Sequence, residues 1–177
     1  TGADDGGQVF RTPVIGNYAW MTHIHELGHA LGLQHSHDSG AGSFGAALPQ
    51  DRRSIECSVM SYLSFAGAAP GYTNEQFGFS QTFMMYDILA LQYLYGADYS
   101  TNSGNTVYSW NPGTGQMFVD GVGQGLPGAN RIFLTIWDGN GNDTYDMSNY
   151  GTGVSIDLRP EMWSVTSAAQ LADLDWR

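Results

Sequence analysis

The first half of the chain combines two helical patterns with long polar loops. Apolar residues at helical spacing predict a helix from about residue 17 or 18 to residue 31, with a buried stripe of Ile24, Leu27 and Leu31. Asn17 is the expected N-cap, because its side-chain oxygen can accept from free backbone N–H groups. Gly32 is the expected end, because glycine readily takes the left-handed conformation that terminates helices.

A second helical pattern covers about residues 82–95 and stops at Gly96. Its expected buried face consists of Met84, Ile88, Leu91 and Tyr95. Glycine-rich stretches predict loops before and between the helices, at about residues 1–16, 36–56 and 66–80. Long loops in compact domains are often functional, which bears on the long irregular connection at about residues 36–56.

After about residue 100 the pattern changes from helical to short and alternating. Five strands separated by Gly, Asn and Pro turns are predicted at Thr106–Trp110, Gln116–Val119, Arg131–Trp137, Thr144–Met147 and Val154–Leu158. The chain is therefore predicted to be α+β, with helices first and strands later. We place the boundary near residues 98–103, which gives one unit at 1–99 and a second, β-rich unit at 100–177.

Composition and charge narrow the classes of partner. Among 177 residues there are 6 basic and 17 acidic side chains, which gives a formal charge of -11. Nucleic acid and anionic membranes are not expected partners of such a chain, whereas bound cations would offset the excess of carboxylates. Cys57 is the only cysteine, so no disulfide can form within the chain. Bound calcium is therefore expected to stabilise the fold instead.

The residues with the clearest chemistry begin at His25 and follow the pattern H-E-x-x-H-x-x-G-x-x-H. His25 and His29 are four apart, so on a helix they share one face and can bind one zinc ion. After the turn at Gly32, His35 would be the third ligand, which leaves one coordination position for water. Glu26 could then hold the proton of that water. Solvated histidines on an amphipathic helix would explain neither Gly32 nor the spacing to His35, and the full pattern is that of metzincins.

A second motif, Ser58-Val59-Met60-Ser61-Tyr62, lies a little over twenty residues beyond His35. Met60 is expected to form an apolar surface beneath the zinc. Considered without the upstream motif, Met60 would be an ordinary methionine that fills space in the core. Tyr62 could bind the resting metal, or move away and donate a hydrogen bond to the oxyanion. The alternative for Tyr62 is a buried phenol with a backbone partner.

These two motifs, together with the D-I-x-A-x-Q-x-L-Y-G segment of residues 87–96, resemble the serralysin family of secreted, calcium-dependent bacterial metzincins. The resemblance covers roughly residues 17–160. It implies a metzincin catalytic half followed by the start of a calcium-binding β-roll or β-sandwich. It also implies that His25, His29, His35 and Tyr62 bind zinc, that Glu26 is the catalytic base, that the substrates are proteins or peptides, and that the protein is extracellular.

An oxygen-rich turn at residues 138–146 is the candidate calcium site. Asp138 and Asp143 supply charge, and glycines between them allow carbonyl groups to converge. The resemblance implies a first site built from Asn102, Gly104, Thr106, Asp138, Asn140 and Asp143, and a second site that begins at Gly141 and Asp143. A solvated hairpin turn is the alternative, because Gly, Asn and Asp are common turn residues.

Three departures from the serralysin pattern qualify these expectations. Ser36 stands where that family usually has proline, only 24 residues precede His25, and the long series of glycine-rich repeats is missing after Leu158. We therefore expect a monomeric central part or short form of a larger protease. A separate N-terminal fragment of the same protease, which would provide the substrate-binding edge strand, is a candidate partner. Two alternatives are a non-catalytic zinc- and calcium-binding module and a calcium-dependent adhesion or secretion module.

Overall fold

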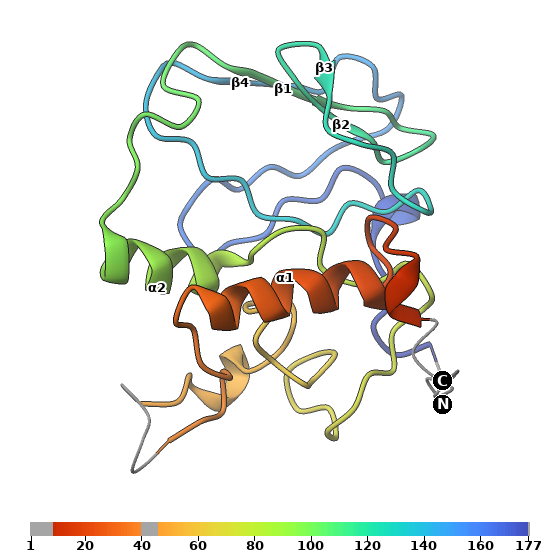
Figure 1. Cartoon of the computed structure of the whole chain (residues 1–177). Helices are drawn as coiled ribbons and strands as arrows, with labels where there is room; N and C mark the ends of the chain where they lie inside the picture. The colour runs from red at the N-terminus through yellow and green to blue at the C-terminus, as the bar shows by residue number, and fades with distance from the viewer. Residues whose placement is uncertain (1–8, 40–45, 177) are drawn as a thin grey trace.

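The computed structural model describes residues 9–39 and 46–176 (Figure 1). Helix α1 spans Tyr18–Ala30 and begins at Asn17, whose side-chain oxygen accepts from the Trp20 N–H at 2.8 Å. Gly32 follows with a φ of +92°, in the left-handed region. The predicted helix, its N-cap and its glycine terminator are therefore confirmed.

The buried face of α1 differs from the predicted stripe. The buried residues are Ala19, Met21, His25 and Gly28, whereas Leu27 is 51% exposed. Of the predicted stripe, Ile24 is only partly buried, against the core. The prediction that Leu27 belongs to the core was wrong, because the helix turns its histidine face inward and Leu27 lies on nearly the opposite side.

Helix α2 spans Met85–Tyr95, which begins three residues later than predicted and ends at Gly96 as expected. Met84 is fully buried before its first turn, but Tyr95 is 68% exposed and does not belong to a buried face. The Tyr95 hydroxyl instead donates to the Leu31 carbonyl oxygen at 2.8 Å. This bond joins the end of α2 to the end of α1.

The β half contains a small mixed sheet in the order β3-β2-β1-β4. Its strands are β1 Val107–Trp110, β2 Met117–Val119, β3 Val122–Gly123 and β4 Thr144–Asp146. Strand β4 pairs parallel to β1, while β2 pairs antiparallel to β1 and to β3. Three predicted strands are confirmed in place, β3 was not predicted, and the α+β class is confirmed.

Two predicted strands were wrong, since in the described chain residues 131–137 and 154–158 join no ladder. In the first segment the Ile132 N–H donates to the Gln170 carbonyl, and the Thr135 N–H donates to the Thr82 hydroxyl. In the second, Ser155 forms one isolated bridge with Val165. The extended chain thus meets its hydrogen-bonding needs at separate points instead of along one neighbouring strand.

The main core lies at the two helices and extends into the later half of the chain. Its buried members are Met21, Leu33, Ile55, Val59, Met60, Phe79, Met84 and Phe133. Figure 1 shows the sheet on one side of the molecule and both helices on the other, with the segment of Phe133 between them. The proposed boundary near residues 98–103 stays a prediction.

Residues near 173–176 lie against the loop that begins at Thr73. The Arg131 guanidinium binds the Glu75 carboxylate, with 2.9 Å between Nη2 and Oε2. Glu75 also accepts from the Asp173 N–H at 2.8 Å, and the Thr73 hydroxyl donates to the Leu174 carbonyl. The last described residues are therefore tied to the loop that follows Tyr62.

The predicted loops are irregular where the structure describes them. Short 3-10 turns occur at Val9–Arg11, Gln50–Arg52 and Ala168–Gln170. The parts of the predicted loops at residues 1–8 and 40–45 lie outside the described residues. None of the helices in the described residues combines the length and the apolar character that are needed to cross a lipid bilayer.

Candidate active site

Three histidine side chains meet at one point beside the C-terminal half of α1. His25 and His29 lie on this helix, and His35 follows it after the turn at Gly32. Ligand-type nitrogens of the three rings lie within 4.8 Å of one another. The Nε2 atoms of His29 and His35 are 3.1 Å apart, and two nitrogens bound to one tetrahedral zinc would lie about 3.3 Å apart.

The outer hydrogen bonds of the rings determine which nitrogens can bind a metal. The Nδ1 atom of His25 lies 2.8 Å from the Val59 carbonyl oxygen, and that of His29 lies 2.9 Å from the Leu33 carbonyl oxygen. A carbonyl only accepts, so both Nδ1 atoms carry the proton and both Nε2 atoms present a lone pair. The lone pair of His29 Nε2 faces Nε2 of His35 at 3.1 Å, close to the separation of two nitrogens that bind one zinc ion. The donor set therefore fits a zinc ion.

His35 differs from the two helical histidines in its surroundings. Its Nδ1 atom lies 3.3 Å from Oδ2 of Asp38, a carboxylate instead of a carbonyl. Burial lowers the pKa of His35, Asp38 acts in the opposite direction, and His29 and His25 lower it further. The net effect favours the neutral imidazole, which is the form that binds metal.

Tyr62 extends its hydroxyl to the same point. Its oxygen lies 2.6 Å from His35 Nε2, and its ring stacks on that of His25 at a centroid distance of 5.7 Å. Burial raises the pKa of Tyr62, and the charges of Glu26 and Asp38 raise it further. Tyr62 is 41% exposed and Glu26 is exposed, so both can meet a molecule that arrives from solvent.

The turn of Met60 lies directly beneath the histidines. Met60 is 1% exposed, and its sulfur is so close to Gly28 of α1 that a Cβ there would approach within 2.6 Å. The Val59 carbonyl accepts from His25, and the Met60 carbonyl accepts from the Ser36 N–H at 3.1 Å. The turn therefore supports both the helical ligands and the chain that leads away from His35.

Asp87 supports this turn from below, a role that our sequence reasoning missed. The side chain is 2% exposed, and it accepts from the Ser58 hydroxyl at 2.6 Å and the Val59 N–H at 2.8 Å. It also accepts from the Met84 N–H at 2.9 Å, as the third helical residue does in a capping box. An acidic residue three positions after the start of a helix was the signal in the sequence that could have identified this role of Asp87. Burial raises the pKa of Asp87 to about 6, although the hydrogen bonds act to lower it.

The two segments expected to share calcium lie side by side. The Gly139 N–H donates to the Thr101 carbonyl at 2.8 Å, and the Asn142 N–H donates to the Asn105 side chain at 3.0 Å. The Thr106 N–H donates to Oδ1 of Asp143 at 2.9 Å. The loop around Asn102, Gly104 and Thr106 is thereby placed against the loop of Asp138, Asn140, Gly141 and Asp143.

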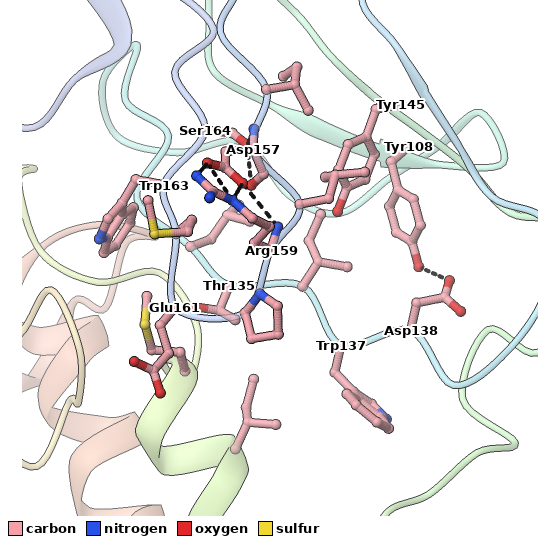
Figure 2. A pocket seen from close by; sticks show the side chains of 18 of the residues that line it. Tyr108, Thr135, Trp137, Asp138, Tyr145, Asp157, Arg159, Glu161, Trp163 and Ser164 are labelled. Carbon is pink, nitrogen blue, oxygen red and sulfur yellow. Dashed lines mark hydrogen bonds and ion pairs between the residues drawn. The ribbon is translucent and has the colours of Figure 1, made fainter.

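Two details of these loops bear on cation binding. Gly141 has a φ of +127°, and a Cβ there would lie 1.9 Å from the Gly104 carbonyl oxygen. Asp138 accepts from the Tyr108 hydroxyl at 2.6 Å, a bond that Figure 2 shows. The loops thus bring carbonyl and carboxylate oxygens together, which are the ligands that calcium prefers.

A groove of about 740 Å³ lies between α2 and the β half, away from the histidines (Figure 2). Apolar side chains such as Ile88, Leu134 and Trp163 line most of it. Arg159 binds the Asp157 carboxylate within it. The lining supplies neither the three histidines nor Glu26, so the groove is separate from the candidate active site.

Known proteins resemble this chain over most of its length. The Met-zincin family model matches residues 7–107, and the model described as Peptidase M10 serralysin C terminal matches residues 97–168. Metalloprotease AprA of Pseudomonas entomophila is 37% identical over 89% of this chain and 32% of its own length. Serralysin of Proteus mirabilis is 35% identical over 90% of this chain and 32% of its own length.

Serralysin G of Dickeya chrysanthemi is 34% identical over 82% of this chain and 30% of its own length. The chain thus spans about a third of the length of these relatives. The resemblance to serralysins inferred from the motifs is confirmed. With the family match covering the histidine motif and the turn of Met60, the chain belongs to the Met-zincin family, and its later half is related to the C-terminal region of serralysins.

Proposed function

We propose that this chain carries the catalytic centre of a zinc-dependent endopeptidase that hydrolyses internal peptide bonds of proteins. The observation that carries this proposal is the convergence of His25, His29 and His35, with the Nε2 atoms of His29 and His35 3.1 Å apart. The Tyr62 hydroxyl reaches the same point. Relatives named metalloprotease and serralysin support the same reaction class.

The residues of the chain have distinct roles in this reaction. Zinc held by the three histidines would polarise the scissile carbonyl and acidify a water molecule. Glu26, exposed beside His25, takes the proton of that water and later passes it to the leaving amine. The Tyr62 hydroxyl, which reaches the histidines from a side chain 41% exposed, donates a hydrogen bond to the oxyanion.

We further propose that calcium binds between residues 102–106 and 138–143. The ligands would be Asn102, Gly104, Thr106, Asp138, Asn140, Gly141 and Asp143. The hydrogen bonds that already join these loops support this assignment, because calcium would then stabilise an existing arrangement. We expect the protease to be secreted, monomeric and active on extracellular proteins or peptides.

A non-catalytic module that binds zinc and calcium is the second candidate. It is favoured by the fact that the chain spans about a third of its relatives, so the surface that holds an extended substrate could belong to residues outside it. Intact Glu26 favours the enzyme, since a metal-binding module has no need of a base beside its ligand.

The test is casein cleavage by the 177-residue chain, with a zinc chelator, zinc add-back and the Glu26→Ala variant. The enzyme predicts cleavage that zinc restores and that the variant loses while still binding zinc. Bound zinc without cleavage would support the module, and adding the missing N-terminal part of a relative would then test whether activity returns. A chain that binds no zinc would overturn both.

A further inference from the structure

The outer partners of the three histidines are not equivalent. His25 and His29 each donate from Nδ1 to a neutral backbone carbonyl, at 2.8 Å and 2.9 Å. The Nδ1 atom of His35 lies 3.3 Å from the carboxylate of Asp38. Among the described residues, this is the single carboxylate recorded in contact with one of the three rings.

His35 also has the greatest need for an outer partner. His25 belongs to α1 and His29 lies near its end, so the helix fixes where both rings point. His35 lies beyond Gly32 in irregular chain, where rotation of the backbone would carry its ring away from the other two. Contacts within the loop must therefore orient this ring.

Asp38 restrains both the backbone and the ring of His35. Its Oδ2 atom accepts from the backbone N–H of His35 at 3.2 Å, while the Asp38 N–H donates to the His35 carbonyl at 3.0 Å. The same Oδ2 atom faces Nδ1 of the ring. One carboxylate oxygen thus closes the turn and lies 3.3 Å from Nδ1, where it favours a proton, while Nε2 is the atom that faces His29.

Resting on the proposed function, we infer that Asp38 is the positioning residue of the third zinc ligand. It keeps His35 in the Nδ1-protonated tautomer and increases the basicity of Nε2. An outer carboxylate of this kind changes metal affinity about 10- to 100-fold when it is lost. The Asp38 side chain is 39% exposed, and exposed ion pairs contribute little to stability, so we expect the fold to survive its removal.

His37 offers a competing explanation for Asp38. Its Nε2 atom lies 3.8 Å from Oδ1 of Asp38, and its ring stacks on that of His35 at 5.4 Å. The three side chains are close enough to hold a metal ion of their own. If they did, Asp38 would be a direct ligand of a second ion, and the chain would bind one more zinc than the proposed site requires.

The experiment measures zinc affinity by competition with a fluorescent chelator, in calcium-containing buffer, for the wild type and for Asp38→Asn, Asp38→Ala and Asp38→Glu. We expect the affinity to fall about 10-fold for Asn and up to about 100-fold for Ala, with Glu restoring part of the loss. The matched control is Asp51→Asn, an aspartate 73% exposed whose recorded partner is Arg52, and its affinity should equal that of the wild type.

Two spectroscopic measurements distinguish a specific effect on the position of the His35 ring from a general loss of structure. In the metal-free chain, long-range ¹⁵N–¹H NMR should show His35 as the Nδ1-protonated tautomer in the wild type and as a mixture in Asp38→Ala. In the cobalt-substituted chain, the visible absorption bands should shift in Asp38→Asn and stay unchanged in Asp51→Asn.

The inference is overturned if the Asp38 variants bind zinc as tightly as the wild type and keep its cobalt spectrum. It is also overturned if the wild type binds a second zinc that the Asp38 variants lose. These outcomes leave the proposed function standing, whereas a wild-type chain without tight zinc binding would overturn the proposed function and this inference together.

Discussion

Replacing Asp87 by alanine should destabilise the Met60 turn and, through it, the proposed zinc site. The change removes the acceptor of the Ser58 hydroxyl and of the Val59 and Met84 N–H groups, all in the interior. The hydroxyl can rotate toward another partner, but the two backbone groups cannot. A buried group left unpaired costs about 1–3 kcal/mol, so we expect a loss of about 2–6 kcal/mol. That is a large share of the about 5–15 kcal/mol typical of a domain.

Asp87→Asn is the control that keeps one acceptor. Its amide oxygen can take the place of Oδ2, which accepts from both backbone N–H groups, so the loss should be far smaller than for alanine. Only the carboxylate titrates. Burial raises the pKa of Asp87 from 3.8 to about 6, so the folded chain holds this proton longer than the unfolded one. The resulting stability is fully present below pH 3.8 and is lost as the pH rises through about 6.

The wild type should therefore lose about 2 kcal/mol relative to Asp87→Asn between pH 4 and pH 7, while titration of the histidines cancels in this difference. Urea unfolding followed by tryptophan fluorescence measures each stability, and chelator competition measures zinc affinity. The reasoning would be refuted by an alanine variant that unfolds within about 1 kcal/mol of the wild type and binds zinc equally well.

Three further perturbations test other parts of the molecule. Tyr62→Phe should lower kcat on the order of 10²-fold with little change in KM, because one oxyanion donor is lost, and peptide-cleavage kinetics with an unchanged kcat would remove Tyr62 from the mechanism. Gly141→Ala should abolish the rise in Tm that calcium produces, because its φ of +127° and an adjacent carbonyl exclude a Cβ, whereas Gly151→Ala, in open space, should keep that rise. Burial alone would raise the pKa of Glu75, but hydrogen bonds from Arg131 and a backbone N–H lower it below 4.5. The advantage of the wild type over Glu75→Gln in urea unfolding should thus be present above pH 4.5 and vanish in acid, and a constant difference would contradict this.

The sequence was most informative where chemistry restricts each position. The spacing of the histidines requires a helix and then a turn, so α1, its Asn17 cap and the terminator Gly32 could be predicted together. The same spacing predicts that His35 lies beside His29, and their Nε2 atoms are 3.1 Å apart. The metal and catalytic roles of these residues stay predictions.

Burial and strand pairing could not be predicted as well. The hydrophobic pattern assigned Leu27 to the core, but Gly28 and the face of α1 that carries His25 occupy the interior, against the Met60 turn. Residues 131–137 alternate like a strand, yet their hydrogen-bond partners lie on separate segments. The buried position of Asp87 depends on two segments that meet only in the folded chain.

The contact between Thr73–Glu75 and residues 173–176 has a consequence for the order of folding. It joins residues about a hundred positions apart, through the Glu75 bond to the Asp173 N–H and the Thr73 bond to the Leu174 carbonyl. Loop closure over such a distance is slow and entropically costly. During synthesis, the histidine motif therefore emerges long before the loop after Tyr62 acquires these contacts, so this loop would be among the last parts of the described chain to become fixed.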